Sequence, residues 1–182
     1  EMTRREIHLA KKKGIAPVLH VVGYDAVAVY LHKDNPLSSL NFSQLADIYA
    51  QGGKAERWTD LGVEVPGCGE QKIVRVGRQN SSGTYAYLSR NVLGQKDFKL
   101  GTLGAQASKD VVALVVKTPC AIGYSSFAYV TPDIKVACLS ETPDEPCSKP
   151  SIAGVTERTY PISRPLYMYT NGPADGDVKA YL

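Results

Sequence analysis

The run from Tyr24 to Leu31 constrains the fold more than any other stretch, because it is apolar at almost every position. A strand with one wet face alternates apolar and polar side chains, and this run shows no clean alternation. Such runs are typical of strands that are covered on both faces. Asn41–Tyr49 reads as a capped helix, and it is stopped by Gly52 and Gly53. Alternating strands and helices predict an α/β fold with a mixed, mostly parallel sheet flanked by helices.

Capping residues, glycines and prolines predict the other elements. Thr3 opens a capping box, and the helix from there to Gly14 is expected to bury Ile7, Leu9 and Ala10. Strands are expected at 73–76, 121–126, 134–138 and 164–170, helices at 85–93, 109–116 (capped by Ser108) and 178–182, and loops at 98–104 and 139–161.

Composition places the chain among folded globular proteins, with 43% hydrophobic and 21% charged residues. Its 182 residues suit one ordinary domain or two small lobes. The net charge is only +3, and the one basic cluster, Lys11–Lys13, lies at an expected helix end, where cations are favoured. Nucleic-acid binding is therefore not indicated. No apolar run approaches the ~20 residues that a membrane-spanning helix needs.

Cys68, Cys120, Cys138 and Cys147 allow three disulfide pairings, or four reduced thiols in a cytosolic protein. Cys138 and Cys147 flank a proline-rich loop and are close enough to close it, which would leave Cys68 with Cys120. The spacings contain no Cys-x-x-Cys and no nearby histidine, so a zinc site is not indicated and no cofactor is implied. Disulfides would place the protein outside the cytoplasm.

A polar turn from Gly77 to Thr84 is the strongest candidate for a functional site. A strand enters it and a helix leaves it, and a helix start offers free N–H groups and a positive dipole end. Ser82 and Thr84 add hydroxyl donors, and Gly83 lets the backbone come close. Arg78 adds a charged fork at the end of the strand. These groups suit a tetrahedral oxyanion, although Ser82 as a plain helix cap explains part of the pattern.

Competing chemistries lack their residues. A phosphate-binding P-loop is absent, because no lysine follows the glycine of the turn. The surroundings of Ser81 and Ser82 do not fit the Gly-x-Ser-x-Gly of a serine hydrolase. Two of the three histidines, His20 and His32, lie in apolar runs typical of structural or surface positions. Asp25 is expected to be a capping or turn acceptor at a strand start, with a buried functional carboxylate as the alternative. No catalytic residue and no metal ligand is assigned.

Several stretches together resemble the substrate-binding proteins of phosphate ABC transporters, which are type 2 periplasmic binding proteins. In order along about residues 1–170, they are Tyr24–Val29, Asn35–Leu40, Gln44–Tyr49, Trp58–Gly62, Arg78–Thr84 and Ala121–Tyr124. That family has two α/β lobes joined by two crossing strands, with the anion between the lobes. By this resemblance, 24–160 is the second lobe, 1–23 is a remnant of the first lobe with the first crossover, and 161–182 holds the second crossover and the start of the return to the first lobe.

The resemblance also implies a ligand set. The phosphate contacts fall on Arg78, Ser82, Gly83 and Thr84, with weaker contributions from Asn80 and Ser81. Arg78 would pair with phosphate oxygens, and the serine and threonine would donate hydroxyl and N–H groups. Gly83 would donate its N–H. Asn80 stands where the family often has aspartate, which removes a negative charge near the anion.

The implied function is binding of inorganic phosphate as the extracytoplasmic solute-binding component of an ABC importer. The membrane permease would be the partner, no catalysis is involved, and the location would be periplasmic or extracellular. The residues alone leave open sulfate, molybdate or tungstate, a sensor domain on the same fold, and a phosphate-handling hydrolase using Ser82. Glu1 and Leu182 fall inside expected helices, so both ends look cut. The family's first-lobe ligands would precede Glu1.

Overall fold

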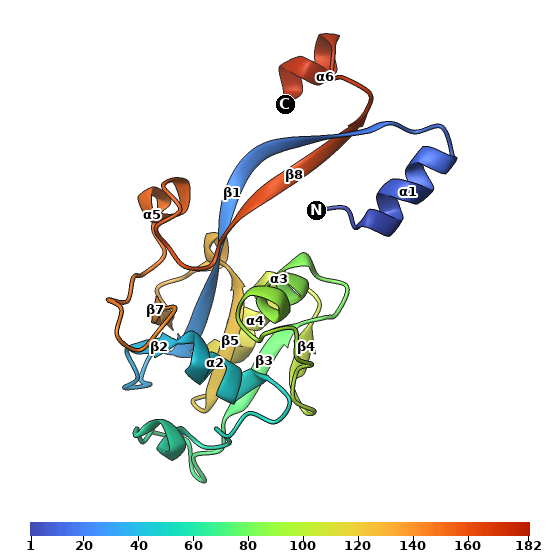
Figure 1. Cartoon of the computed structure of the whole chain (residues 1–182). Coiled ribbons are helices and arrows are strands. Elements are labelled where there is room, and N and C mark those ends of the chain that lie inside the picture. Colours follow the sequence, from blue (N-terminus) through green and yellow to red (C-terminus); the bar gives the residue numbers. More distant parts are fainter. The chain divides into compact units, whose positions relative to one another are not determined.

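The computed structural model describes residues 1–182 and divides into two compact units. Unit 1 comprises Glu1–Asp25 and Arg164–Leu182, and unit 2 comprises Ala26–Ser163. One long strand, β1 (Pro17–His32), starts in unit 1 and ends in unit 2 (Figure 1). The polar turn lies wholly within unit 2, so the candidate site is built from that unit alone.

Unit 2 alternates strands and helices as the sequence predicts. After β1 its elements are β2 (Ser39–Asn41), α2 (Phe42–Tyr49), β3 (Val74–Arg78), α3 (Gly83–Asn91), β4 (Leu103–Ala105), α4 (Ser108–Lys117), β5 (Ala121–Ser126), β6 (Ile134–Val136), β7 (Cys138–Ser140) and α5 (Ile152–Thr156). Asn41 and Gln44 form the reciprocal capping box that starts α2, which confirms the expected helix.

The main sheet has six strands in the order β4-β3-β5-β1-β6, with β8 (Ser163–Asn171) also pairing with β1. β3 runs parallel to both β4 and β5, whereas β1 is antiparallel to β5 and β6. β2 and β7 form a separate parallel pair. The predicted mixed α/β sheet flanked by helices is therefore confirmed.

Alternate residues of β1 enter two different cores, which explains why this stretch lacks polar alternation. Val27 and Val29 pack into a cluster with α2 side chains such as Leu45, while Ala28 and Tyr30 pack into a second cluster with α4. All of these side chains are completely buried. The expectation of a strand covered on both faces is confirmed.

Close packing of α4 on the sheet requires a glycine in β5. A Cβ at Gly123 would lie 2.8 Å from the Val111 and Val115 side chains. Because this contact is shorter than real Cβ atoms show, α4 can rest on β5 only where the side chain is missing. This packing holds α4, which carries part of the site, against β5.

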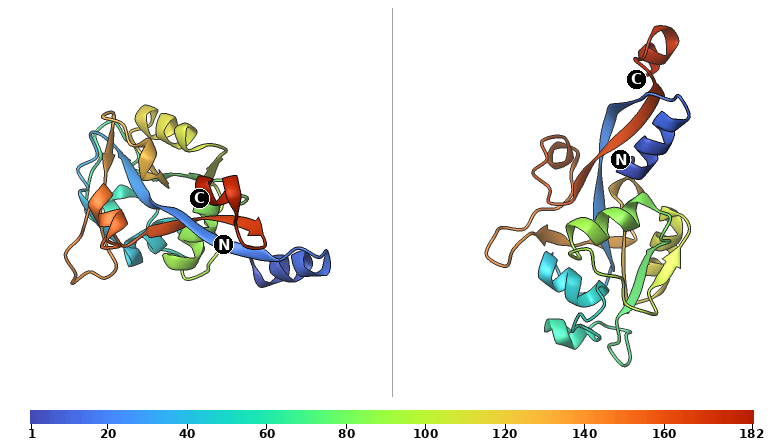
Figure 2. Two further views of the ribbon diagram at one scale, coloured as in Figure 1. Left: turned by 90° about the horizontal axis from the view of Figure 1, so that it is seen from above. Right: turned by 45° about the vertical axis from the view of Figure 1, so that its right-hand side comes forward.

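Unit 1 contains α1 (Arg4–Lys12), α6 (Gly176–Tyr181) and the paired parts of β1 and β8, which run side by side (Figure 2). The predicted capping box between Thr3 and Glu6 is present. The prediction that Ile7, Leu9 and Ala10 form a buried side is wrong, because α1 buries no residue and Leu9 is 48% exposed. Unit 1 has too few elements to cover that face.

Three expected elements differ, two of them because tertiary pairing overrides local pattern. The loop expected at 98–104 contains the start of β4, which forms by pairing with β3. The strand expected at 134–138 is divided at Ala137, since β6 pairs with β1 and β7 pairs with β2. The proline-rich loop contains α5, which Ser151 caps by accepting a hydrogen bond from the Gly154 N–H at 3.0 Å.

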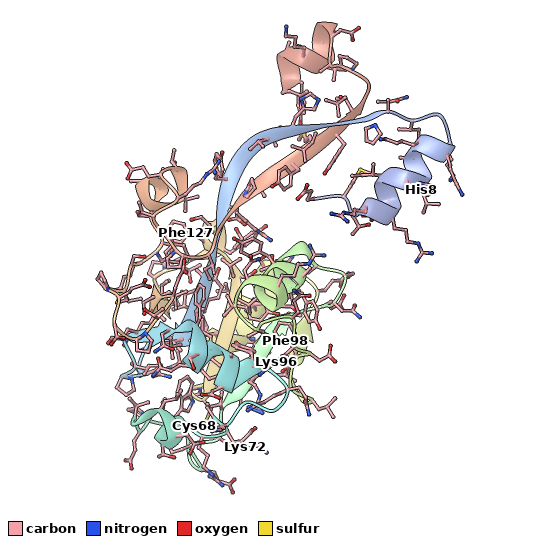
Figure 3. The ribbon with its side chains drawn as sticks, viewed as in Figure 1. His8, Cys68, Lys72, Lys96, Phe98 and Phe127 are labelled. Atoms are coloured by element: carbon pink, nitrogen blue, oxygen red, sulfur yellow. A yellow bond between two sulfur atoms is a disulfide. The ribbon has the colours of Figure 1, made fainter.

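The cysteines form two disulfides, Cys68–Cys120 and Cys138–Cys147, which confirms the expected pairing and overturns the reduced alternative. Cys68 is 1% exposed and lies in the core near Trp58, and Figure 3 labels its position. Cys147 is exposed. No helix has both the length and the apolar character needed to cross a membrane.

Candidate functional site

The polar turn links the end of β3 to the start of α3. The Ser82 N–H donates to the Gln79 carbonyl at 2.9 Å, which closes the turn. The Gln79 N–H donates to the Ala105 carbonyl at 3.1 Å, which ties the turn to the end of β4. Ser82 is the N-cap, because its Oγ accepts from the Thr84 N–H at 3.2 Å. The turn is thus anchored on both sides by backbone contacts.

Arg78 is the last residue of β3, and its side chain reaches the segment that starts α4. Nη1 donates to Ser108 Oγ at 2.9 Å, and Nη2 donates to the Gln106 carbonyl at 2.9 Å. Nε is buried without a hydrogen-bond partner. A guanidinium carries five N–H donors, so this fork still has donors to give after both contacts are made.

Two helix starts meet at one edge of the sheet. β3 and β4 are parallel, and they lead into α3 and α4 respectively. The carboxyl ends of parallel strands share an edge, so both positive helix ends lie where open α/β sheets bind ligands. Arg78 spans this edge, from the end of one strand to the helix that follows the other.

Ser108 does not cap α4 as expected. Ala107 is the N-cap residue, and the Asp110 carboxylate accepts its N–H at 3.0 Å. Because Ser108 is the first residue of α4 and not its N-cap, its hydroxyl is available to Arg78. Sequence reasoning missed Ser108 and Gln106 as partners of Arg78. These partners follow from the parallel pairing of β3 with β4. That pairing is hard to recognise in the sequence because β4 is only three residues long.

The Tyr124 hydroxyl contacts the backbone at the end of β3. Its Oη lies 3.5 Å from the Arg78 backbone nitrogen, and a Cβ at Gly77 would come within 3.0 Å of the same oxygen. Burial raises the pKa of the Tyr124 phenol well above its usual value, so the hydroxyl stays neutral. Phe98 stacks on Tyr124 at 5.8 Å, and Tyr49 meets it edge-on at 5.3 Å between ring centroids. Figure 3 labels Phe98.

The residues of the turn differ in how far they are exposed to solvent. Asn80, Ser81 and Gly83 are exposed, and Ser82 is partly buried. Thr84 is only 3% exposed. With one arginine, a helix start and no carboxylate within the turn, this surface can attract an anion and has little to offer a cation.

His20 and His32 contact groups other than this turn. His20 Nε2 lies 2.9 Å from Thr170 Oγ1, and His32 Nδ1 lies 3.3 Å from the Asp34 N–H nitrogen. His8 belongs to α1 (Figure 3). No group of three or more histidine, cysteine, aspartate or glutamate side chains is placed to hold a metal ion.

Asp25 was expected to be a turn acceptor, and that expectation is wrong. It lies inside β1, and its Oδ2 accepts from Arg164 Nη2 at 2.8 Å and from Arg164 Nε at 3.2 Å. The pair connects β1 with β8 in unit 1. The expected role failed because a single continuous strand replaces the strand start that the sequence suggested.

Comparison with known proteins gives one consistent result. A family model described as a PBP superfamily domain matches residues 1–182. The phosphate-binding protein PstS of Pseudomonas aeruginosa is 33% identical over 168 residues, which is 88% of this chain and 51% of that protein. PstS of Bacillus subtilis is 32% identical over 180 residues, covering 97% and 56%. The chain therefore spans about half the length of the curated relatives it matches.

Solved structures agree with these sequence relatives. A Clostridium perfringens protein solved with bound phosphate superposes with a TM-score of 0.74 at 25% identity, over 100% of this chain and 68% of that one. A possible phosphate binding protein from Planctomyces limnophilus superposes with a TM-score of 0.71 at 26% identity, over 94% and 61%. The mixed α/β architecture is thus shared with proteins of this kind.

Proposed function

Because the chain belongs to the family of PBP superfamily domains, we propose that it binds inorganic phosphate as part of the solute-binding component of an ABC importer. The proposal draws on its similarity to two phosphate-binding proteins named PstS. It involves no chemical step on the ligand. The membrane permease of the importer is the proposed partner.

Arg78 carries the proposal. Its fork is fixed at the sheet edge by Ser108 and Gln106, and its Nε has no partner. A fixed arginine beside the start of α3 needs no reorganisation to receive an oxyanion, which favours binding. In this proposal Arg78 pairs with phosphate oxygens, and the N–H of Gly83 completes the contact at the helix start.

The remaining residues of the turn have graded roles in this proposal. Ser82 and Thr84 donate their hydroxyl and N–H groups after small rearrangement, since the Thr84 N–H now bonds to Ser82 Oγ. Asn80 and Ser81 are exposed and contribute less. A charge-assisted hydrogen bond contributes ~1.5–3 kcal/mol, and micromolar binding needs ~8 kcal/mol. The turn therefore needs ligands from a second surface to bind phosphate tightly.

The division of the chain into two units bears on the lobe assignment. We propose that residues 24–160 form one α/β lobe, and that 1–23 and 161–182 carry the crossover strands and parts of another lobe. Unit 1, with β1 paired to β8, supports this assignment. An extracytoplasmic location is part of the proposal, and it is supported by the two disulfides.

Calorimetric titration of phosphate, sulfate and molybdate tests the proposal, using the natural protein that contains this chain. We expect phosphate to bind in preference to the other two anions, and Arg78→Gln to abolish that binding. Arg90→Gln is the matched control, because Arg90 lies exposed in the last turn of α3 and should leave affinity unchanged. Phosphate binding that survives Arg78→Gln would remove the site assignment.

The alternatives have distinct outcomes in the same experiment. Tighter binding of sulfate, molybdate or tungstate, lost in Arg78→Gln, would keep the site and replace the ligand. A hydrolase would release product from a phosphate ester, and Ser82→Ala would stop that release. The bond from the Thr84 N–H to Ser82 Oγ places this serine in a capping role and favours binding over catalysis.

A further inference from the structure

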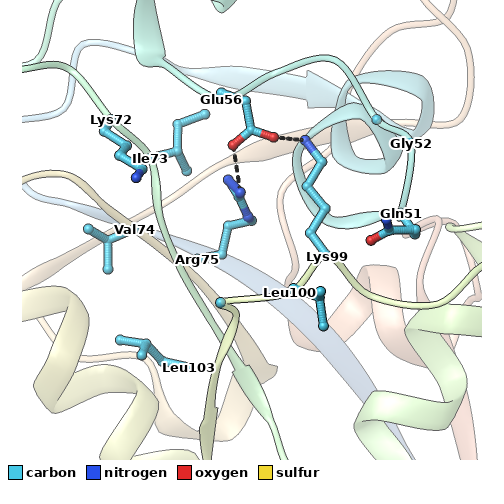
Figure 4. A pocket seen from close by; sticks show the side chains of 12 residues that line it. Gln51, Gly52, Glu56, Lys72, Ile73, Val74, Arg75, Lys99, Leu100 and Leu103 are labelled. Carbon is cyan, nitrogen blue, oxygen red and sulfur yellow. Dashed lines mark hydrogen bonds and ion pairs between the residues drawn. The ribbon is translucent and has the colours of Figure 1, made fainter.

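A second charged pocket lies in unit 2, away from the polar turn. Its volume is about 690 Å³, and its wall includes Glu56, Lys72, Arg75, Lys99, Leu100 and Leu103 (Figure 4). Arg75 stands three residues before Arg78 in β3, and an odd spacing along a strand puts their side chains on opposite faces of the sheet. The pocket is therefore separate from the proposed phosphate site.

Arg75 is buried and only partly satisfied. It is 8% exposed, and its Nη2 donates to Glu56 Oε2 at 2.7 Å. Its Nη1 is buried with no hydrogen-bond partner. Figure 4 shows the guanidinium pointing from β3 toward the Glu56 carboxylate, in the middle of the lining side chains. A buried charged donor without an acceptor is rare and calls for an anionic partner.

The charges of the pocket do not balance. Lys99 is 7% exposed, and its Nζ donates to the Asp47 and Ala55 carbonyls at 2.9 and 3.0 Å and to Glu56 Oε1 at 2.8 Å. One carboxylate thus serves two buried cations. Lys72 adds a third positive group to the wall. The pocket has an excess of positive charge, and one buried donor, Arg75 Nη1, lacks an acceptor.

Apolar side chains complete the wall. Leu100, which is 89% exposed, and Ile73, which precedes Arg75 by two positions just before β3, line this pocket. A volume of this size is typical of pockets for small organic ligands, roughly 300–1,000 Å³, and exceeds what a bare inorganic oxyanion fills. The ligand should therefore combine an anionic head with an apolar body.

We propose that this pocket binds a small organic carboxylate. The carboxylate accepts from Arg75 Nη1 and is attracted by Lys72, while its hydrocarbon part contacts Leu100. Glu56 remains paired with Lys99 and holds the arginine in place. Binding here does not depend on phosphate binding at the turn, because the two arginines use opposite faces of β3.

Amide NMR titration of the 182-residue chain with isovalerate tests this proposal, and isovaleramide is the uncharged control ligand of the same shape. We expect saturable shifts at amides around the pocket, such as those of Val74 and Gly101, with isovalerate only. Arg75→Gln should weaken isovalerate binding by about tenfold or more, as expected for loss of a charge-assisted hydrogen bond. Arg90→Gln, which changes an exposed arginine in α3, should leave it unchanged.

Lys72→Gln provides a second test at an exposed position, and it should weaken binding several-fold even if Arg75→Gln fails to fold. Several outcomes would overturn the proposal. They are the absence of saturable shifts in the wild type, equal shifts with isovaleramide, shifts confined to residues 79–84, or unchanged affinity in a folded Arg75→Gln variant. Loss of phosphate binding at the turn would leave these results unaffected.

Discussion

Arg78 Nη1 donates a hydrogen bond to Ser108 Oγ at 2.9 Å and so connects the end of β3 with the first residue of α4. This contact joins residues that are 30 positions apart in sequence. It is possible because β3 and β4 run parallel and because Ala107, and not Ser108, is the N-cap residue of α4. The candidate anion site is therefore supported by a helix other than the one that begins at the turn.

Removing the Ser108 hydroxyl should weaken phosphate binding without removing a proposed ligand contact. Ser108→Ala leaves Arg78 held only through Gln106, so we expect affinity to fall about three- to tenfold, less than a full charge-assisted hydrogen bond is worth. Ser108→Thr keeps a hydroxyl and should restore binding. Ser43→Ala at an exposed position of α2 is the control. Calorimetric titration with phosphate measures these affinities. An unchanged affinity in Ser108→Ala would contradict a positioning role for Ser108.

The sequence predicts those parts of the fold whose causes are local. The capping boxes at Thr3 and Asn41 involve residues three positions apart, so their patterns are visible in the chain. The apolar run of β1 likewise predicts that both faces of this strand are buried. Cys138–Cys147 has a sequence separation of only 9 and is also predictable from spacing.

Other features depend on contacts that no local pattern encodes. β4 is a strand because β3 lies beside it, and Ala137 separates two strands because each finds a different partner. The Arg75 pocket also depends on such contacts, because Glu56 and Lys99 come from segments distant in the sequence. Arg75, the single charged residue in the apolar run at 73–76, was a local indication of this pocket. Arg78 was recognised from its place at a strand end, whereas its partners were not.

The two disulfides should differ in their contribution to stability. Cys68–Cys120 closes a loop with a sequence separation of 52, and Cys138–Cys147 closes one of 9. Loop-closure entropy then gives about 4 kcal/mol for the first and about 2.5 kcal/mol for the second. Urea unfolding of the two double cysteine-to-alanine variants measures each loss. Equal losses, or a larger loss for the short loop, would contradict the entropic explanation.

The Asp25–Arg164 pair should stabilise the paired strands of unit 1. Both side chains are largely buried, with 13% and 16% exposed, and the shorter contact is 2.8 Å. Breaking a fully buried pair costs about 3–5 kcal/mol, and the residual exposure should reduce this to about 2–3 kcal/mol for Arg164→Met. Hydrogen exchange of β8 amides reports the change locally.

A surface pair in the turn that follows β1 serves as the control. Lys33 and Asp34 are 3.4 Å apart, with 65% and 52% of their side chains exposed. Exposed pairs contribute little, so Lys33→Met should change exchange by less than about 0.5 kcal/mol. Combining Asp25→Asn with Arg164→Met should cost less than the sum of the two single changes. Strictly additive costs would show that the pair does not act as a unit.

Glu56 should make stability depend on pH on the acid side. The hydrogen bond from Lys99 lowers the pKa of Glu56 below its ordinary value of 4.5, and the charge of Arg75 lowers it further, while burial opposes both. In the folded protein the carboxylate thus holds its proton less tightly than in the unfolded chain. Its contribution is fully present above about pH 4.5 and is lost as the pH falls through the lowered pKa.

Urea unfolding of wild type and Glu56→Gln between about pH 3 and about pH 7 measures this dependence. The stability difference between the two should be greatest near neutral pH and should shrink below about pH 4.5, because the wild-type carboxylate then becomes neutral as well. Glu64→Gln, which changes an exposed glutamate, controls for the general loss of one negative charge. A difference that stays constant across the range would mean that Glu56 does not compensate Lys99 and Arg75 as a charge, and that the pocket's positive excess is larger than its contacts indicate.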